Sequence, residues 1–136
     1  MTLRYLVDTN VLSALALPAP DGALAKKLSA AAGAIAMGAP AWHELRFGVD
    51  RLPVSRRKAT LAAYLAELEQ IIPILPYDAA AATWHARERA RLEARGKTPA
   101  FVDGQLAAIA AIHGLALVTR NVRDFAAFKG LTVERW

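Results

Sequence analysis

The chain has 136 residues, a formal charge of +5 at neutral pH and no cysteine. This length allows one hydrophobic core and is too short for two ordinary domains, so we expect a single domain over residues 1–136. The absence of cysteine excludes a disulfide framework and a thiolate zinc site. No apolar run reaches the ~20 residues that cross a bilayer, and no secretory signal is recognisable, so we expect a soluble, cytoplasmic protein without a membrane partner.

The excess of basic residues predicts a polyanionic partner, either nucleic acid or an acidic protein. A hydrophobic fraction of 55% favours tightly packed helices and an apolar surface available for association with another chain. The three histidines, His43, His85 and His113, lack the spacing of a metal-binding motif. We expect each of them to be structural or solvated.

Short apolar segments alternate with helical segments in the first half of the chain. Prolines and glycines mark the boundaries between these segments, because they end or start helices. In chain order we expect a strand at 3–7, helices at 10–17 and 23–32, a strand at 35–37, and a helix that starts at Pro40 and ends between Gly48 and Pro53.

The second half repeats this alternation. Asp78 is expected to cap a helix and Gly96 to close it. We expect helices at 55–70, 78–95 and 100–113, and strands at 71–75, 115–119 and 132–135. Strands alternating with helices predict an α/β fold, a three-layer α/β/α sandwich with a central parallel sheet of four to five strands.

Four acidic residues lie near the expected ends of these elements: Asp8, Glu44, Asp103 and Asp124. Asp8 and the loop that carries Asp124 both follow strands, so they should meet at the edge where open α/β sheets bind ligands. Asp103 lies one turn into an apolar helix, where an unpaired carboxylate is costly. Carboxylates brought together need compensating charge, and oxygen ligands suit Mg²⁺ or Mn²⁺.

Each acid also has an alternative explanation that needs no metal. Asp8 and Asp124 are typical helix caps, and Asp103 is near a helix N-terminus, where the dipole favours an acid. Glu44 taken alone is an ordinary solvated helical acid. Asn121 could simply shape the loop after the fourth strand.

The four acidic segments together resemble the ordered motifs of PIN-domain ribonucleases, most closely the VapC-type toxins of bacterial toxin–antitoxin pairs. The resemblance covers nearly the whole chain. The segments that carry it are LVDTNVL at 6–12, WHELRFG at 42–48, PAFVDGQLAAIA at 99–110 and LVTRNVRDF at 117–125. One departure is Gly104, the residue after the third acid, which we expect to loosen that helical turn.

The resemblance implies which residues form the site. Carried over by position, the metal ligands are Asp8, Glu44 and Asp103, with Asp124 as the more variable fourth acid and Asn121 as its polar competitor. The supporting residues are Thr9 and Thr119, whose hydroxyls lie near the site in the family, and Asn10, which orients the first loop.

The same resemblance implies hydrolysis of RNA by a Mg²⁺- or Mn²⁺-dependent endoribonuclease, with 5′-phosphate and 3′-hydroxyl products. A metal ion held by these acids can lower the pKa of a bound water molecule, so that hydroxide is available near neutral pH. The family also implies a homodimer silenced by a cognate VapB-type antitoxin. Candidates for the antitoxin groove are Leu12, Leu15, Leu17 and Leu24, although core packing is the stronger explanation for any single leucine.

Basic residues must bring RNA phosphates to an acidic pocket. One candidate stripe on the helix at 78–95 has the alternative reading of a solvated face paired with Glu88 and Glu93. The candidate RNA-binding residues are Arg46, Arg87, Arg91, Arg120 and Arg123.

Two other functions compete with this interpretation. A phosphatase of the haloacid-dehalogenase class also begins with an aspartate after its first strand, but it needs a second aspartate where this chain has Asn10. A non-catalytic RNA- or protein-binding module with a PIN fold is the second alternative, and the four retained acids argue against it.

Overall fold

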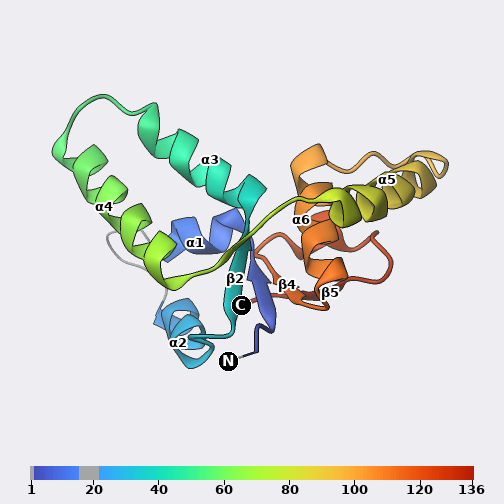
Figure 1. The fold of residues 1–136 in the computed structure, drawn as a ribbon, viewed down its shortest axis with the longest axis horizontal. Helices are drawn as coiled ribbons and strands as arrows, with labels where there is room; N and C mark the ends of the chain where they lie inside the picture. Colours follow the sequence, from blue (N-terminus) through green and yellow to red (C-terminus); the bar gives the residue numbers. More distant parts are fainter. Residues whose placement is uncertain (1, 16–21) are drawn as a thin grey trace.

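Five short strands form one parallel sheet with helices on both of its faces (Figure 1). The computed structural model describes residues 2–15 and 22–136, and for Leu15 its backbone only. The described elements are β1 Tyr5–Val7, α1 Thr9–Leu15, α2 Gly22–Ala30, β2 Ile35–Gly38, α3 Ala39–Asp50, α4 Arg56–Ile71, β3 Ile74–Leu75, α5 Ala79–Glu93, α6 Phe101–Ile112, β4 Ala116–Val118, α7 Val122–Phe125 and β5 Thr132–Glu134.

The strand order is β3-β2-β1-β4-β5, and every neighbouring pair is parallel. Tyr5 of β1 is in register with Ile35 of β2 on one side and Ala116 of β4 on the other. From β1 the chain adds β2 and then β3 on one side. It then returns and adds β4 and β5 on the other side. The carboxyl ends of β1 and β4 therefore form a topological switch point, where α/β sheets place their ligand sites.

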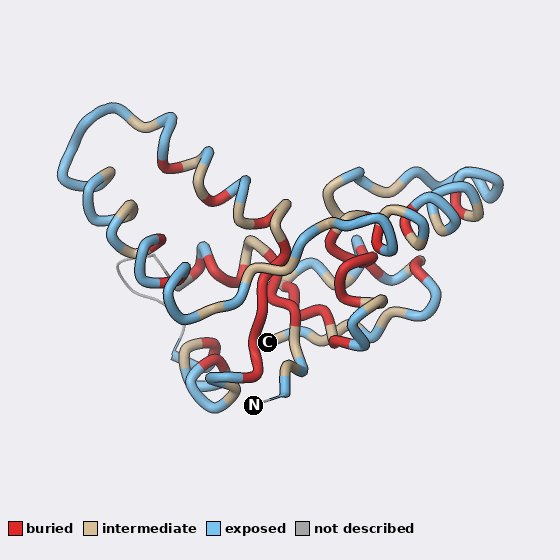
Figure 2. Tube along the Cα trace, viewed as in Figure 1, coloured by how far each residue is buried: buried red, intermediate tan, exposed pale blue. Residues whose placement is uncertain are grey.

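Both faces of the sheet are buried, as the continuous apolar strands predict. Leu6 and Leu117 are fully buried in a core cluster with α5 and α6, while Val7 and Val118 are fully buried in a second cluster with α1 to α4. Successive residues of β1 and of β4 thus pack against the helices on opposite faces of the sheet. Figure 2 shows this burial along the strands and the inner helix faces, with the outer turns of α4 and α5 exposed. The predicted three-layer fold is confirmed.

Two predicted helix starts are confirmed at the level of single hydrogen bonds. Ser55 Oγ accepts from the amide of Lys58 at 3.1 Å at the start of α4, and Asp78 Oδ1 accepts from the amide of Ala81 at 3.0 Å at the start of α5. Both bonds satisfy an amide that has no partner inside its own helix. Pro40 lies in the first turn of α3, where its missing amide hydrogen costs nothing.

Gly38 ends β2 and permits a close approach between layers. A side chain at this position would come within 2.9 Å of Leu106 Cδ2 and 3.1 Å of Ile109 Cδ1. With glycine there, α6 packs directly against the end of β2, beside the first turn of α3. This contact brings the helix that carries Asp103 close to the helix that carries Glu44.

Some predicted boundaries were wrong. The strand expected at 71–75 contains only Ile74–Leu75, because α4 continues to Ile71, a side chain that is 73% exposed, and Pro73 has no amide hydrogen for a ladder. The end of α3, by contrast, is at Asp50, between Gly48 and Pro53 as predicted. The last residues of the helix expected at 10–17, with Leu17 and the prolines that follow it, lie outside the described residues.

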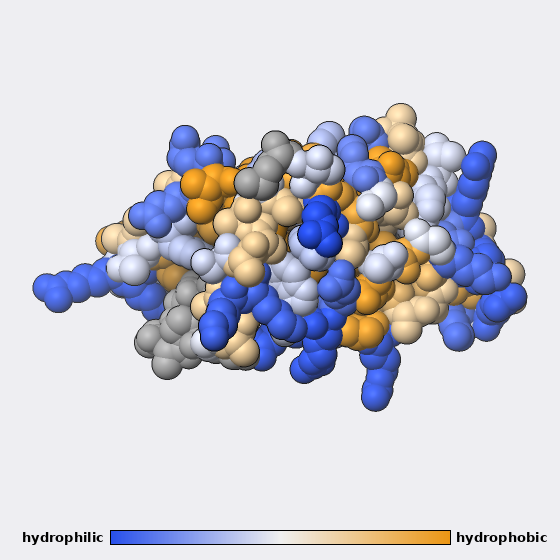
Figure 3. All heavy atoms as spheres, turned by 90° about the horizontal axis from the view of Figure 1, so that it is seen from below, coloured by the Kyte–Doolittle hydropathy of each residue, from blue (hydrophilic) through white to orange (hydrophobic). Residues whose placement is uncertain are grey.

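None of the helices in the described ranges is long and apolar enough to cross a membrane. Figure 3 shows the molecule from below, the side of the amino ends of the strands. Hydrophilic side chains project around the rim of this face, and apolar atoms appear between them in separate patches.

Candidate acidic active site

Asp8 lies directly after β1 with a side chain held by two hydrogen bonds. Its Oδ1 accepts from the amide of Thr9 at 2.7 Å, and its Oδ2 accepts from the hydroxyl of Thr119 at 2.9 Å. Thr119 follows β4 and is fully buried, and its hydroxyl also accepts from the amide of Asn121 at 3.0 Å. The parallel pairing of β1 and β4 places these polar residues side by side at the switch point.

A second bond joins the two loops that leave these strands. The amide of Arg120 donates to Asn10 Oδ1 at 3.3 Å. Asn10 therefore connects the first loop to the last motif.

The other three acids come from helices around the same edge: Glu44 from α3, Asp103 from the first turn of α6 and Asp124 from α7. Burial raises the pKa of Asp103 from 3.8 to about 6, with further increases from the negative charges of Asp8, Asp124 and Glu44. Burial also raises the pKa of Asp8, against the lowering effect of its hydrogen bonds to Thr119 and Thr9. The structure thus brings four distant acidic side chains within electrostatic reach of one another.

The residues at this edge fit a hard divalent cation. They offer carboxylate oxygens that repel one another, which is the environment that a cation stabilises. The hydroxyl of Thr9 is a further indication, because it is buried and has no hydrogen-bond partner among the described residues. Within those residues, no three acidic or histidine side chains already stand at the spacing of one metal ion.

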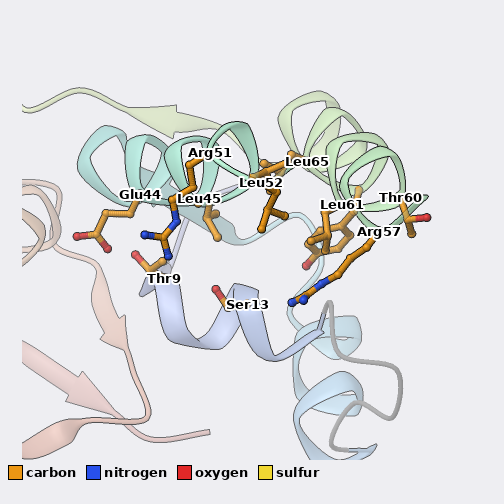
Figure 4. Close-up of a pocket in the computed structure, with 13 residues that line it drawn as sticks. Thr9, Ser13, Glu44, Leu45, Arg51, Leu52, Arg57, Thr60, Leu61 and Leu65 are labelled. Carbon is orange, nitrogen blue, oxygen red and sulfur yellow. The ribbon is translucent and has the colours of Figure 1, made fainter. Parts of the chain in front are cut away.

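Three hollows surround the acidic edge. The largest, about 860 Å³, lies between α1, α3 and α4 and has Thr9 and Glu44 at one end and Arg57 and Thr60 at the other (Figure 4). The second contains Asp103 and Asp124 with Lys97. The third lies beside α7 and is lined by Arg120, Asn121, Val122, Arg123, Asp124 and Arg135.

The predicted RNA-binding arginines have different surroundings. Arg46 is paired with Asp50 at 3.0 Å, and Arg87 is exposed on α5. Arg91 donates two hydrogen bonds to Glu88 and a third to the carbonyl of Ala127, so its charge is engaged within the protein.

Arg120 and Arg123 line the hollow beside Asp124. Arg135, which the sequence prediction missed, lines the same hollow and donates to the carbonyl of Arg120 at 2.7 Å. The register of β5 beside β4 brings it there, and no local sequence signal could have indicated this.

Several expectations at the site need correction. Leu12 and Leu24 are core residues with 0% and 1% exposure, so they cannot line a groove, while Leu17 is outside the described residues. Asp124 lies inside α7 rather than capping it, since the N-cap position belongs to Asn121. Phe101 lies in the apolar helix predicted at 100–113, yet its side chain is 53% exposed.

Comparison with known proteins agrees with this geometry. A model of the PIN domain matches residues 5–131. Toxin FitB of Neisseria gonorrhoeae is 32% identical over 137 residues, which cover 96% of this chain and 97% of that protein. The tRNA(fMet)-specific endonuclease VapC of Shigella flexneri is 27% identical over 135 residues, 98% of each chain. The crystal structure of FitAcB from Neisseria gonorrhoeae has a TM-score of 0.87 at 31% identity, over 95% of both chains.

The fold is that of a PIN domain. The chain belongs to the PIN-domain family and, within it, to the VapC toxins of VapBC toxin–antitoxin systems. The family and fold expected from the sequence are confirmed.

Proposed function

We propose that this VapC-type PIN ribonuclease hydrolyses RNA phosphodiester bonds at the carboxyl edge of its sheet, with residues 1–136 acting as one nuclease domain. In this proposal Asp8, Glu44 and Asp103 hold Mg²⁺ or Mn²⁺, and Asp124 is the fourth acid. The observation that carries the proposal is the convergence of these carboxylates, which contributes to raising the pKa of Asp103 to about 6. Such mutual repulsion is costly unless a cation relieves it.

A divalent cation at this edge supplies Lewis-acid chemistry, which acidifies a water molecule near neutral pH and offsets negative charge on the phosphate. The protein's own residues supply orientation. The hydroxyl of Thr119 and the amide of Thr9 fix the plane of the Asp8 carboxylate, so its oxygens face a defined direction before any ligand binds. Hydrolysis by water needs no attack by the ribose 2′-hydroxyl, and the expected products carry 5′-phosphates.

RNA must approach this acidic edge along cationic surface. The hollow lined by Arg120, Arg123 and Arg135 adjoins Asp124, and the hollow with Lys97 adjoins both Asp103 and Asp124. Both hollows share an acid of the proposed site, whereas Arg46 and Arg91 are engaged in ion pairs. We place the RNA backbone across α7, with the scissile phosphate at the acids. Because the Shigella relative is named for initiator tRNA, tRNA is the first RNA class to test.

The proposal includes a cognate VapB-type antitoxin. Among the solved structures similar to this chain is a member of the VapBC family of toxin–antitoxin systems. The largest of the three hollows is a groove between α1, α3 and α4. It suits a helical antitoxin segment, because its lining includes Leu45, Val49 and Leu61 and one end opens at Glu44. A cationic antitoxin side chain at that end would compete with the metal ion for the acids. A homodimer and a cytosolic site of action, as in the family, belong to the same proposal.

The decisive experiment is expression of the chain with and without its neighbouring reading frame, followed by mapping of 5′-phosphorylated RNA ends. We expect growth arrest and discrete new 5′-phosphate ends, both abolished by Asp8→Asn or Asp103→Asn and both reversed by the neighbouring gene product. Each substitution removes a charge and keeps the shape, so the purified variants should retain their fold by circular dichroism.

The same experiment separates the competing functions. RNA binding that is equal with and without Mn²⁺, without any cleavage, would favour a non-catalytic module. Release of phosphate from a chromogenic ester without RNA cleavage would favour a phosphatase, although Asn10 stands where that chemistry needs an acid. Full cleavage by purified Asp103→Asn protein would show that Asp103 is not part of the active site.

A further inference from the structure

The residue after Asp103 is packed in a way that the sequence does not reveal. Gly104 is buried in the first turn of α6, and a side chain there would come within 2.6 Å of Cδ2 of His85 and closer still to Nε2. Contacts this short do not occur between real side chains, so His85 occupies the space that any other residue at 104 would need. We expected Gly104 to loosen this turn. The ring of His85, from α5, instead fills the space beside the glycine.

His85 is held rigidly at this position. It is 4% exposed, and its Nδ1 shares a 2.8 Å hydrogen bond with the hydroxyl of Tyr77. Its ring centroid lies 4.8 Å from that of Phe101. Thus one side chain of α5 touches the residues at 101 and 104, which bracket Asp103.

The start of α6 lacks the side-chain hydrogen bond that caps the starts of α4 and α5. Its N-cap residue, Ala100, makes no side-chain hydrogen bond, in contrast to Ser55 at α4 and Asp78 at α5. A glycine in the first turn also raises the conformational freedom of that turn. Since α5 packs beside α6 (Figure 1), the ring of His85 lies directly against this first turn, which has no side-chain cap of its own.

We infer that His85, fixed by Tyr77 and fitted against Gly104, is a positioning residue that sets the place of Asp103 at the acidic edge. This inference rests on the proposed function, because it assigns Asp103 to the metal site. His85 touches neither RNA nor metal in this role. Its effect passes through the backbone of the first turn of α6, where a small displacement moves a carboxylate away from its partners.

The test is a double-mutant cycle of wild type, Gly104→Ala, His85→Ala and the double variant, read by calorimetric titration of the purified protein with Mn²⁺ alone. We expect each single substitution to weaken Mn²⁺ binding about tenfold, because one inserts a clash and the other removes the support. The double variant should return to within about threefold of wild type, since the methyl group introduced at position 104 takes part of the space of the ring. Tyr77→Phe removes only the hydroxyl that holds the ring of His85. It should weaken Mn²⁺ binding in the same direction but by less.

Leu28→Ala is the matched control, because it cuts a buried side chain of α2 in the other core cluster. It should lower Tm and leave Mn²⁺ affinity unchanged. If Gly104→Ala does not fold, His85→Ala and Tyr77→Phe carry the test alone. Unchanged Mn²⁺ affinity in the folded variants, or losses that multiply in the double variant, would overturn the inference. Failure of the wild type to bind Mn²⁺ would overturn the proposed function as well, so the two failures are distinguishable.

Discussion

The hydroxyl of Thr119 donates a 2.9 Å hydrogen bond to Oδ2 of Asp8, across 111 positions of sequence. Both residues follow neighbouring parallel strands, so the bond depends on the pairing of β1 with β4. It also ties the first and last motifs into one site. Loss of this bond should therefore affect both the acidic edge and the stability of the sheet.

Replacing Thr119 with valine should impair cleavage and destabilise the protein. Valine keeps the shape of threonine but removes the hydroxyl that donates to Asp8 and accepts from the amide of Asn121. Loss of a buried hydrogen bond with one partner left unsatisfied costs about 1–2 kcal/mol, measurable by urea unfolding. Thr119→Ser retains the hydroxyl and should keep both bonds. Equal stability and cleavage in the valine and serine variants would contradict this role.

The contribution of Asp103 to the stability of the metal-free protein should fall as the pH rises from about 4 to about 7. Burial and three neighbouring acids raise the pKa of Asp103 from 3.8 to about 6, so the folded chain binds more protons than the unfolded chain between these values. An acid with a raised pKa contributes its stability below the unfolded value and loses it as the pH passes the folded value. The measurement is the difference in Tm between wild type and Asp103→Asn across this range, which should widen with pH in favour of the variant.

Arg91 should contribute to stability rather than to RNA binding. It donates to both carboxylate oxygens of Glu88 and to the carbonyl of Ala127, while Glu88 also accepts from the amide of Lys129. These bonds fasten α5 to the segment after Asp124. Arg91→Ala should lower Tm and leave the salt dependence of RNA binding unchanged, whereas Arg87→Ala, on the exposed face of the same helix, should not change Tm. A normal Tm for Arg91→Ala would refute the structural role.

Arg123 should contact the RNA backbone. It is exposed and lines the hollow beside Asp124 together with Arg120 and Arg135. Removing one phosphate contact reduces the slope of log K against log salt by about one unit. Fluorescence titration of catalytically inactive Asp8→Asn protein, with and without Arg123→Ala, measures this slope. Arg87→Ala in the same background tests the α5 surface instead, and a larger effect there would move the RNA path to α5.

The groove proposed for the antitoxin, between α1, α3 and α4, can be blocked without touching the acids. Thr60 is exposed on α4 and lines the groove, so Thr60→Arg should weaken neutralisation by the antitoxin while RNA cleavage remains normal. Ala66→Arg places the same side chain on an exposed position of α4 that does not line the groove. Co-expression rescue assays with both variants give the comparison. Equal rescue of both would place the antitoxin elsewhere.

The sequence by itself determined the fold class, and it singled out four acids that the structure brings within electrostatic reach of one another. Apolar strands that serve two cores, caps such as Asp78, and helix starts such as Pro40 are local signals, because they depend on residues within one or two turns. The four motifs in order were enough to indicate the family. Element ends were less predictable, as the short strand β3 shows, since α4 continues to Ile71 and only Ile74 and Leu75 pair with β2.

Only the tertiary structure decided how these acids are held and which arginines lie beside them. The bond from Thr119 to Asp8, the place of Arg135 beside Asp124, and the fit of His85 against Gly104 join residues that are not neighbours in the chain. The local spacing of Glu88 and Arg91 allowed an ion pair, but only the structure shows that Arg91 is engaged by Glu88 and that Arg123 lines a hollow at the site. The physical reason is that hydrogen bonds, desolvation and packing act over a few ångströms of space, and strand register and helix packing alone determine which residues share that space.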